Sequence, residues 1–166
     1  MLSMDLPMQL VLASLGGVVG TVAMDGIKYV GHKAHLIGGV RMEMLGRWSL
    51  GMLKGQFVHA DIGKSPALPG ETTAGWIFHY LTGIVVAWFY PFFVLAFGLS
   101  MSPPQIGSAV IFGLCTSVLP WFMVYPAFGK GWFGSKAPKD ARPILTSIVS
   151  HTFYGAGIGV VFLVAA

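Results

Sequence analysis

Charged side chains are scarce in this chain of 166 residues. Asp, Glu, Lys and Arg make up 10% of it, whereas hydrophobic residues make up 55%. A soluble domain carries about 25% charged residues, so most of the charge that would face water is missing. The mean hydropathy of +0.74 agrees with this shortage, and the composition predicts an integral membrane protein.

Cysteine is almost absent as well. The single one, Cys115, lies in an apolar run, so the sequence offers neither a disulfide nor a cysteine-based zinc site. The chain also lacks a nucleophile elbow, a phosphate-binding loop and a dinucleotide-binding fingerprint. These absences favour a protein that is not an enzyme. The basic residues behind the net charge of +4 are not spread over the chain. Their placement does not indicate a nucleic-acid-binding patch, so we expect no nucleic-acid partner.

What the chain does contain is long apolar runs. A helix needs about 20 residues to cross the hydrocarbon core of a bilayer. Four stretches meet this length: residues 6–30, 73–97, 106–125 and 144–164. The first begins after Asp5 rather than a basic segment, so we expect a retained helix and not a signal peptide. The sequence predicts an all-α integral membrane protein, with residues 1–166 forming one polytopic domain that is a bundle of four transmembrane helices.

The basic residues predict the orientation of these helices. All ten Lys and Arg residues lie in or at the edge of two connections, residues 31–72 and 127–143. Because positive charge favours the cytoplasmic side, we expect both connections in the cytoplasm and both termini outside. Within the first connection, residues 41–57 mix apolar and basic side chains, which suits either an interfacial helix on anionic lipid or a loop folded under the bundle. Its glycines weaken the helix interpretation.

A weak internal repeat accompanies this arrangement. A shift of 72 residues aligns four pairs of identical residues: Lys64 with Lys136, Pro66 with Pro138, His79 with His151 and Gly83 with Gly155. Both segments enter the membrane from the same predicted side, so the pattern predicts a duplicated pair of parallel helical hairpins. Chance similarity at matching helix starts is the alternative interpretation.

Ionisable residues inside the predicted spans indicate the candidate site. Asp25, His79 and His151 come from three different spans, and the helical rise places each roughly 7–10 Å inside the cytoplasmic end. Intramembrane ionisable groups are rare and often functional. Secondary candidates are polar or aromatic residues of the four predicted spans: Thr21, Thr82, Tyr125 and Tyr154. By contrast, we expect the polar residues of the first connection to be solvated loop residues: His32, His35, His59, Asp61 and Glu71.

Several chemistries fit the three-residue site. Two imidazoles and a carboxylate suit a transition metal, and two facing histidines suit the iron of a b-type haem in a redox subunit. The same groups suit a proton relay or a small polar ligand in transport or binding. A structural hydrogen-bond network is the remaining alternative. Because four helices make a thin bundle, we expect a homo-oligomer or a partner membrane subunit, in which the chain could be a non-catalytic accessory subunit.

Short motifs along the chain also resemble those of a known family. The features are listed in chain order: Ala23-Met24-Asp25, Gly46-Arg47-Trp48, Gly55-Gln56-Phe57, His59, Ile62, Pro69-Gly70-Glu71, Gly75-Trp76, His79-Tyr80, Pro120, Pro126, Gly129, Ser135, Pro138, Ser147, His151 and Gly155. They resemble a group of small bacterial inner-membrane proteins known as domain of unknown function 2938. The resemblance implies a four-helix protein of the bacterial inner membrane, and it implies no activity, cofactor or substrate.

Overall fold

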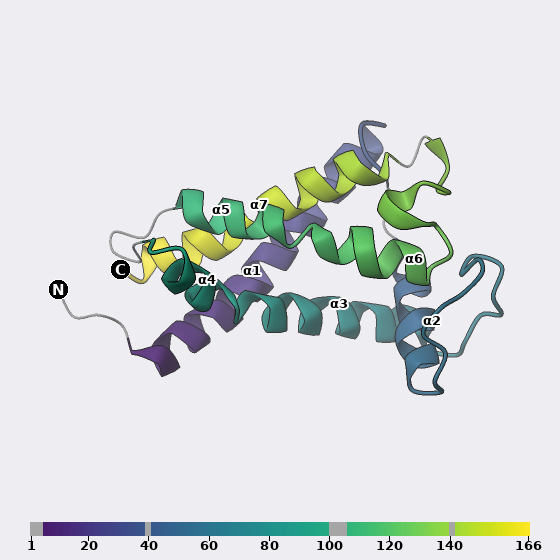
Figure 1. The fold of residues 1–166 in the computed structure, drawn as a ribbon, viewed down its shortest axis with the longest axis horizontal. Helices are drawn as coiled ribbons and strands as arrows, with labels where there is room; N and C mark the ends of the chain where they lie inside the picture. Colours follow the sequence, from purple (N-terminus) through teal and green to yellow (C-terminus); the bar gives the residue numbers. More distant parts are fainter. Residues whose placement is uncertain (1–4, 39–40, 100–105, 140–141) are drawn as a thin grey trace. The chain divides into compact units, whose positions relative to one another are not determined.

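The computed structural model describes residues 5–38, 41–99, 106–139 and 142–166, and across these ranges the chain forms helices and no strands (Figure 1). Four helical segments are long and apolar enough to cross a membrane: Leu6–Lys33, Glu71–Ala96, Ile106–Ala127 and Pro143–Val164. They coincide closely with the four predicted spans. Four such segments in one chain indicate a multi-pass membrane protein.

Two of the four segments are interrupted near a proline. The second consists of α3 (Glu71–Ala87) and α4 (Tyr90–Ala96), with Pro91 in the first turn of α4. The third consists of α5 (Ile106–Cys115), a π-helical stretch η1 (Pro120–Val124) and α6 (Tyr125–Ala127). Proline has no N–H to bond the carbonyl four residues before it, so a regular helix cannot run through it undisturbed. The uninterrupted segments are α1 (Leu6–Lys33) and α7 (Pro143–Val164).

The chain falls into two compact units. Unit 1 comprises the described parts of Met1–Ile27, Tyr80–Thr116 and Val149–Ala166. Unit 2 comprises those of Lys28–His79 and Ser117–Ile148. Helices α1, α3 and α7 each contribute residues to both units.

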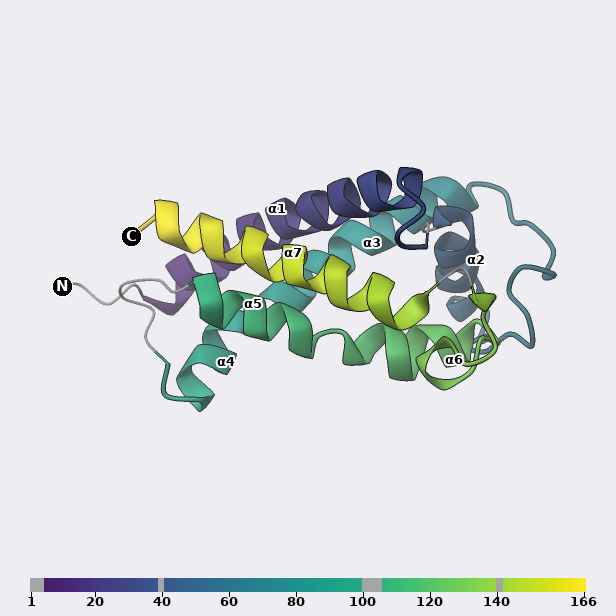
Figure 2. The same cartoon turned by 90° about the horizontal axis from the view of Figure 1, so that it is seen from above.

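Unit 1 is built on close approaches between helix backbones. A Cβ atom at Gly17 would lie 2.7 Å from both the Gly83 carbonyl oxygen and the Ile84 Cα. A Cβ at Gly113 would lie 2.7 Å from the Cα of Gly155, which brings α5 directly against α7 (Figure 2). Small residues allow transmembrane helices to pack this closely. Gly17 and Gly113 are therefore packing residues.

Unit 2 contains a helix where the sequence left helix and loop open. α2 (Met42–Met52) buries one face against the start of α3. Gly46 lies against the Glu71 carbonyl and Gly75 against the Met42 carbonyl, so neither position has room for a side chain. Trp48 of α2 also makes edge-on ring contacts with Phe78 and Phe128. Gly46, one of the glycines that weakened the helix interpretation, is thus a contact that fixes this helix.

Candidate functional sites

A buried ion pair organises unit 2. Arg47 of α2 donates from Nε and Nη2 to the two carboxylate oxygens of Glu71, at 2.9 and 2.8 Å. Its Nη1 donates to the carbonyl oxygens of Ile62 and Ser65, at 2.9 and 2.7 Å. The Leu68 N–H donates to Glu71 as well, at 2.8 Å. A charged side chain can be buried when it is paired with an opposite charge and its polar atoms are hydrogen-bonded. The bonds of Arg47 and Glu71 meet this condition, and they hold the loop of residues 53–70 against α2 and α3.

Backbone hydrogen bonds attach the same loop to the end of the third candidate span. The His59 N–H donates to the Ala127 carbonyl at 2.7 Å, and the Ile62 N–H donates to the Phe128 carbonyl at 3.1 Å. The Trp48 indole donates to the Phe57 carbonyl at 2.9 Å. The loop is therefore held both to α2 and to the end of the third candidate span.

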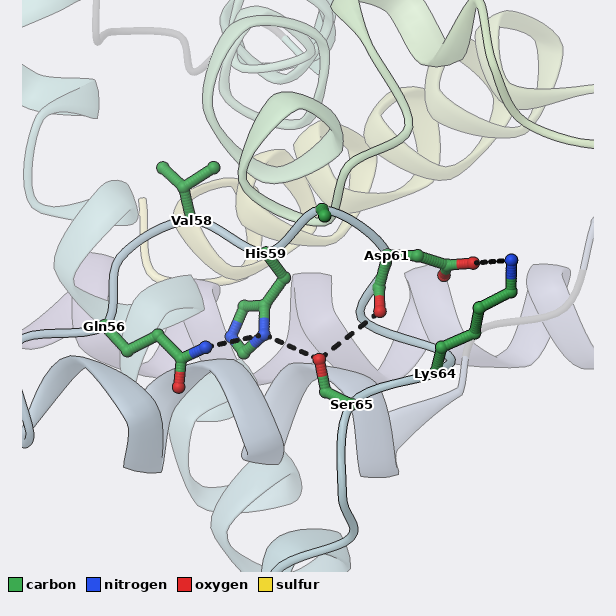
Figure 3. Close-up of a pocket in the computed structure, with 7 residues that line it drawn as sticks. Gln56, Val58, His59, Asp61, Lys64 and Ser65 are labelled. Atoms are coloured by element: carbon green, nitrogen blue, oxygen red, sulfur yellow. Dashed lines mark hydrogen bonds and ion pairs between the residues drawn. The ribbon is translucent and has the colours of Figure 1, made fainter.

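His59 lies at the centre of this loop and is only 4% exposed. Its Nδ1 lies 2.9 Å from the Ser65 hydroxyl and 3.3 Å from the Gln56 amide nitrogen (Figure 3). The Gln56 amide nitrogen can only donate to Nδ1, whereas the Ser65 hydroxyl already donates to the Asp61 carbonyl at 3.3 Å and would accept from Nδ1. The tautomer of the ring therefore decides which of these two contacts is a hydrogen bond. Nε2 is buried and has no hydrogen-bond partner. Burial, together with the positive charge of Arg47, lowers the pKa of His59.

An open hollow of about 450 Å³ adjoins His59. It is lined by seven residues of the loop: Gln56, Val58, His59, Ala60, Asp61, Lys64 and Ser65. The Asp61 carboxylate and the Lys64 ammonium group form an ion pair at 3.4 Å beside it (Figure 3). The hollow therefore offers one negative and one positive group to a ligand.

Among the predicted intramembrane residues, His151 has the best-defined partner. Its Nδ1 lies 2.7 Å from the Thr116 hydroxyl, and that hydroxyl donates to the Gly113 carbonyl at 2.6 Å. A hydroxyl has one proton, so His151 must donate from Nδ1 to Thr116. This bond fixes the orientation of the imidazole ring relative to the end of α5.

The other predicted residues of unit 1 make local contacts. The Tyr80 hydroxyl and the Asp25 carboxylate hydrogen-bond one another. The Thr21 hydroxyl donates to the Gly17 carbonyl at 2.7 Å, within α1. The Tyr154 hydroxyl donates to the Gly83 carbonyl and so connects α7 with α3. Unit 1 thus brings Asp25 together with Tyr80, and His151 together with Thr116.

His79 belongs to unit 2, where its ring contacts Trp76 at a centroid distance of 6.3 Å. Tyr125, also in unit 2, donates from its hydroxyl to the Pro143 carbonyl and lies 3.2 Å from the Ser147 hydroxyl. Thr82 of unit 1 is half-buried. The combined site of Asp25, His79 and His151 stays a prediction. Within the described ranges, no three His, Cys, Asp or Glu side chains are grouped so that they could hold a metal ion.

Two expectations for the first connection are wrong. His59 and Glu71 are buried rather than solvated, whereas His32, His35 and Asp61 are exposed as expected. The physical reason is Arg47, whose guanidinium gives Glu71 a buried partner and holds the loop around His59. The distribution of charge along the sequence gives no reason to identify Arg47 as a functional or structural residue. The only local signal is its place between Gly46 and Trp48, two residues suited to close packing.

The fold and these contacts define a class: a helical multi-pass membrane protein with polar contacts inside its spans and a structured loop outside them. The chain matches the model of a family described as proteins of unknown function (DUF2938) over residues 14–165. It belongs to that family, which confirms the resemblance seen in its motifs. No curated protein and no solved structure matched the chain.

Proposed function

We propose that this protein binds a proton or a small polar ligand within the membrane, with His151 as the titrating or ligating group. The hydrogen bond between His151 Nδ1 and Thr116 carries the proposal. It orients the imidazole ring of His151 within unit 1. An imidazole titrates near neutral pH, and intramembrane histidines recur in proton relays and transporters.

Asp25 supports the same proposal as a second ionisable group within the spans. Its hydrogen bond with Tyr80 keeps the carboxyl group in contact with a donor. In the proposed site, which lies within unit 1, Asp25 acts as the counter-ion, and Thr21, Thr82 and Tyr154 provide hydroxyl groups. The site faces the cytoplasm in a bacterial inner-membrane protein whose basic connections, residues 31–72 and 127–143, are cytoplasmic.

The metal and haem hypotheses gain no specific support from the contacts of Asp25, His79 and His151. The accessory-subunit hypothesis gives the same hydrogen bond a purely structural role. In it, the bond between Thr116 and His151 would only connect α5 with α7, and the chain would act through a partner membrane subunit.

Histidine ¹⁵N spectra of the full-length protein in lipid nanodiscs, recorded from pH 5 to 9, test the proposal. We expect the His151 ring to take up a proton reversibly on Nε2 in the folded protein, and His151→Gln to remove that titration. Liposomes loaded with a pH-sensitive dye should then take up protons with the wild type and not with His151→Gln. A ring that stays neutral throughout, with equal dye signals for both proteins, would leave only the accessory role.

A further inference from the structure

The hollow of unit 2 is lined by a loop that is bonded to the ends of two candidate spans. Ala127 is the last residue of the third candidate span, and the loop is bonded to it through His59. Glu71 is the first residue of the second candidate span and is bonded to the loop through Arg47. Because the loop is held to the ends of two candidate spans, a membrane crossed by these spans would bring its lipid headgroups close to the loop.

The charges beside the hollow are arranged as a pair of opposite sign. The Gly63 N–H donates to Asp61 Oδ1 at 3.0 Å, so this carboxylate is held in place while Oδ2 faces Lys64. Both side chains are largely exposed. An exposed ion pair contributes little by itself, so a ligand with its own two charges can replace it. A zwitterion would give an ammonium group to Asp61 and an anionic oxygen to Lys64.

Exposed apolar side chains of the same loop, one of which lines the hollow, favour a ligand with an apolar part. Phe57 is 60% exposed and Val58 is 68% exposed, and Val58 lines the hollow itself. Leu53 of the same loop is 84% exposed. The backbone of Phe57 is held by Trp48, so this exposure belongs to a fixed part of the loop. Aromatic and apolar residues at headgroup height are typical of lipid contact.

We propose that this hollow binds the headgroup of a membrane phospholipid that carries an ammonium group beside its phosphodiester. The ammonium group bonds Asp61, the phosphate bonds Lys64, and the acyl region contacts Phe57 and Val58. A soluble molecule with the same two charges would share the polar contacts but would not use the apolar residues. The proposal concerns unit 2 alone and does not depend on the role of His151.

Binding of short-chain phosphatidylethanolamine to the detergent-solubilised full-length protein tests this site by calorimetry. We expect tighter binding than for phosphatidylglycerol, and a loss of that preference in Asp61→Asn, which should weaken phosphatidylethanolamine binding about two- to fivefold. Lys64→Gln should weaken the binding of both lipids. Phe57→Ser should weaken lipid binding and leave soluble glycerophosphoethanolamine unaffected.

Lys54→Gln is the matched control, because Lys54 is an exposed lysine of the same loop that does not line the hollow. It should bind both lipids as the wild type does, and thermal melting should show every variant folded. Equal weakening by Lys54→Gln and Lys64→Gln would overturn the proposal in favour of a diffuse surface charge. Equal affinity for glycerophosphoethanolamine and for the lipid would overturn the choice of a membrane ligand.

Discussion

Both units of this protein contain close backbone packing at glycines, but the polar interactions inside each unit differ. Unit 1 relies on backbone approaches at Gly17, Gly20 and Gly113 and on neutral hydrogen bonds such as that between Thr116 and His151. Unit 2 relies on the ion pair of Arg47 and Glu71, whose remaining donors and acceptors are taken by the loop. Lipid tails give no hydrophobic drive for helix association, so spans depend on close packing. A connection outside the spans can instead be organised around charge.

The largest expected effect comes from breaking the ion pair between Arg47 and Glu71. Arg47→Met leaves the buried Glu71 carboxylate without its partner and two loop carbonyls without their donor. Removing one member of a buried pair typically lowers the free energy of unfolding by about 3–5 kcal/mol. We expect denaturant unfolding in detergent to show a loss of this size, and limited proteolysis to cut first within residues 53–70.

Lys64→Gln provides the exposed comparison, because it breaks the pair with Asp61 at the surface of the same loop. This variant should lower the free energy of unfolding by about 0–1 kcal/mol. The double variant Arg47→Met with Glu71→Leu should recover part of the stability, since it removes the uncompensated carboxylate. If Arg47→Met were as mild as Lys64→Gln, the ion pair would not organise unit 2.

Close packing in unit 1 is tested by adding one methyl group. Gly113→Ala would place a Cβ against the His151 carbonyl and 2.7 Å from the Cα of Gly155. Such overpacking lowers the free energy of unfolding by about 1–3 kcal/mol. Gly107→Ala in the same helix is the control, because nothing lies within 4 Å of its Cβ position. It should be neutral or slightly stabilising, as Ala favours helix over Gly. Equal melting temperatures for the two variants would refute the packing argument.

Acid should weaken unit 2 through His59. Because the pKa of His59 is lowered in the folded protein from the ordinary value of 6.5, the unfolded chain binds more protons below that pH. Stability is then complete above pH 6.5 and declines as the pH falls toward the folded pKa, by at most about 1.4 kcal/mol per pH unit. Unfolding curves at pH 7.5, 6.5 and 5.5 measure this slope. His59→Gln should flatten it, and His32→Gln, at an exposed position, should not.

The sequence predicted the four spans because their signal is length and apolarity, which need no tertiary information. It predicted 106–125 and 144–164, and the structure has Ile106–Ala127 and Pro143–Val164. It left α2 undecided because Gly46 and Gly51 count against a helix by propensity alone. In the structure Gly46 is the point of contact with α3. A packing contact between distant residues overrides local propensity and cannot be read from one segment.

The residues of the candidate sites also differ in whether the sequence alone could identify them. Asp25, His79 and His151 could be singled out because an ionisable residue stands out in an apolar run. His59 and Glu71 could not, because a polar residue in a polar loop looks solvated until its partner is known. Arg47 and Glu71 are 24 residues apart, and no helical or strand period connects them. The bundle arrangement and the duplicated hairpins stay predictions.

The smallest expected effect concerns the bond that carries the proposed function. Thr116→Val keeps the shape of the side chain and removes the hydroxyl that accepts from His151 and donates to Gly113. Hydrogen bonds between membrane helices average about 0.6 kcal/mol, so unfolding should be weakened far less than by Arg47→Met. The ¹⁵N spectrum of His151 should nevertheless change, because its Nδ1 proton loses its acceptor. Thr116→Ser keeps the hydroxyl and should preserve both properties. A loss of several kcal/mol in Thr116→Val, absent in Thr116→Ser, would instead show that unit 1 depends on a polar contact as strongly as unit 2.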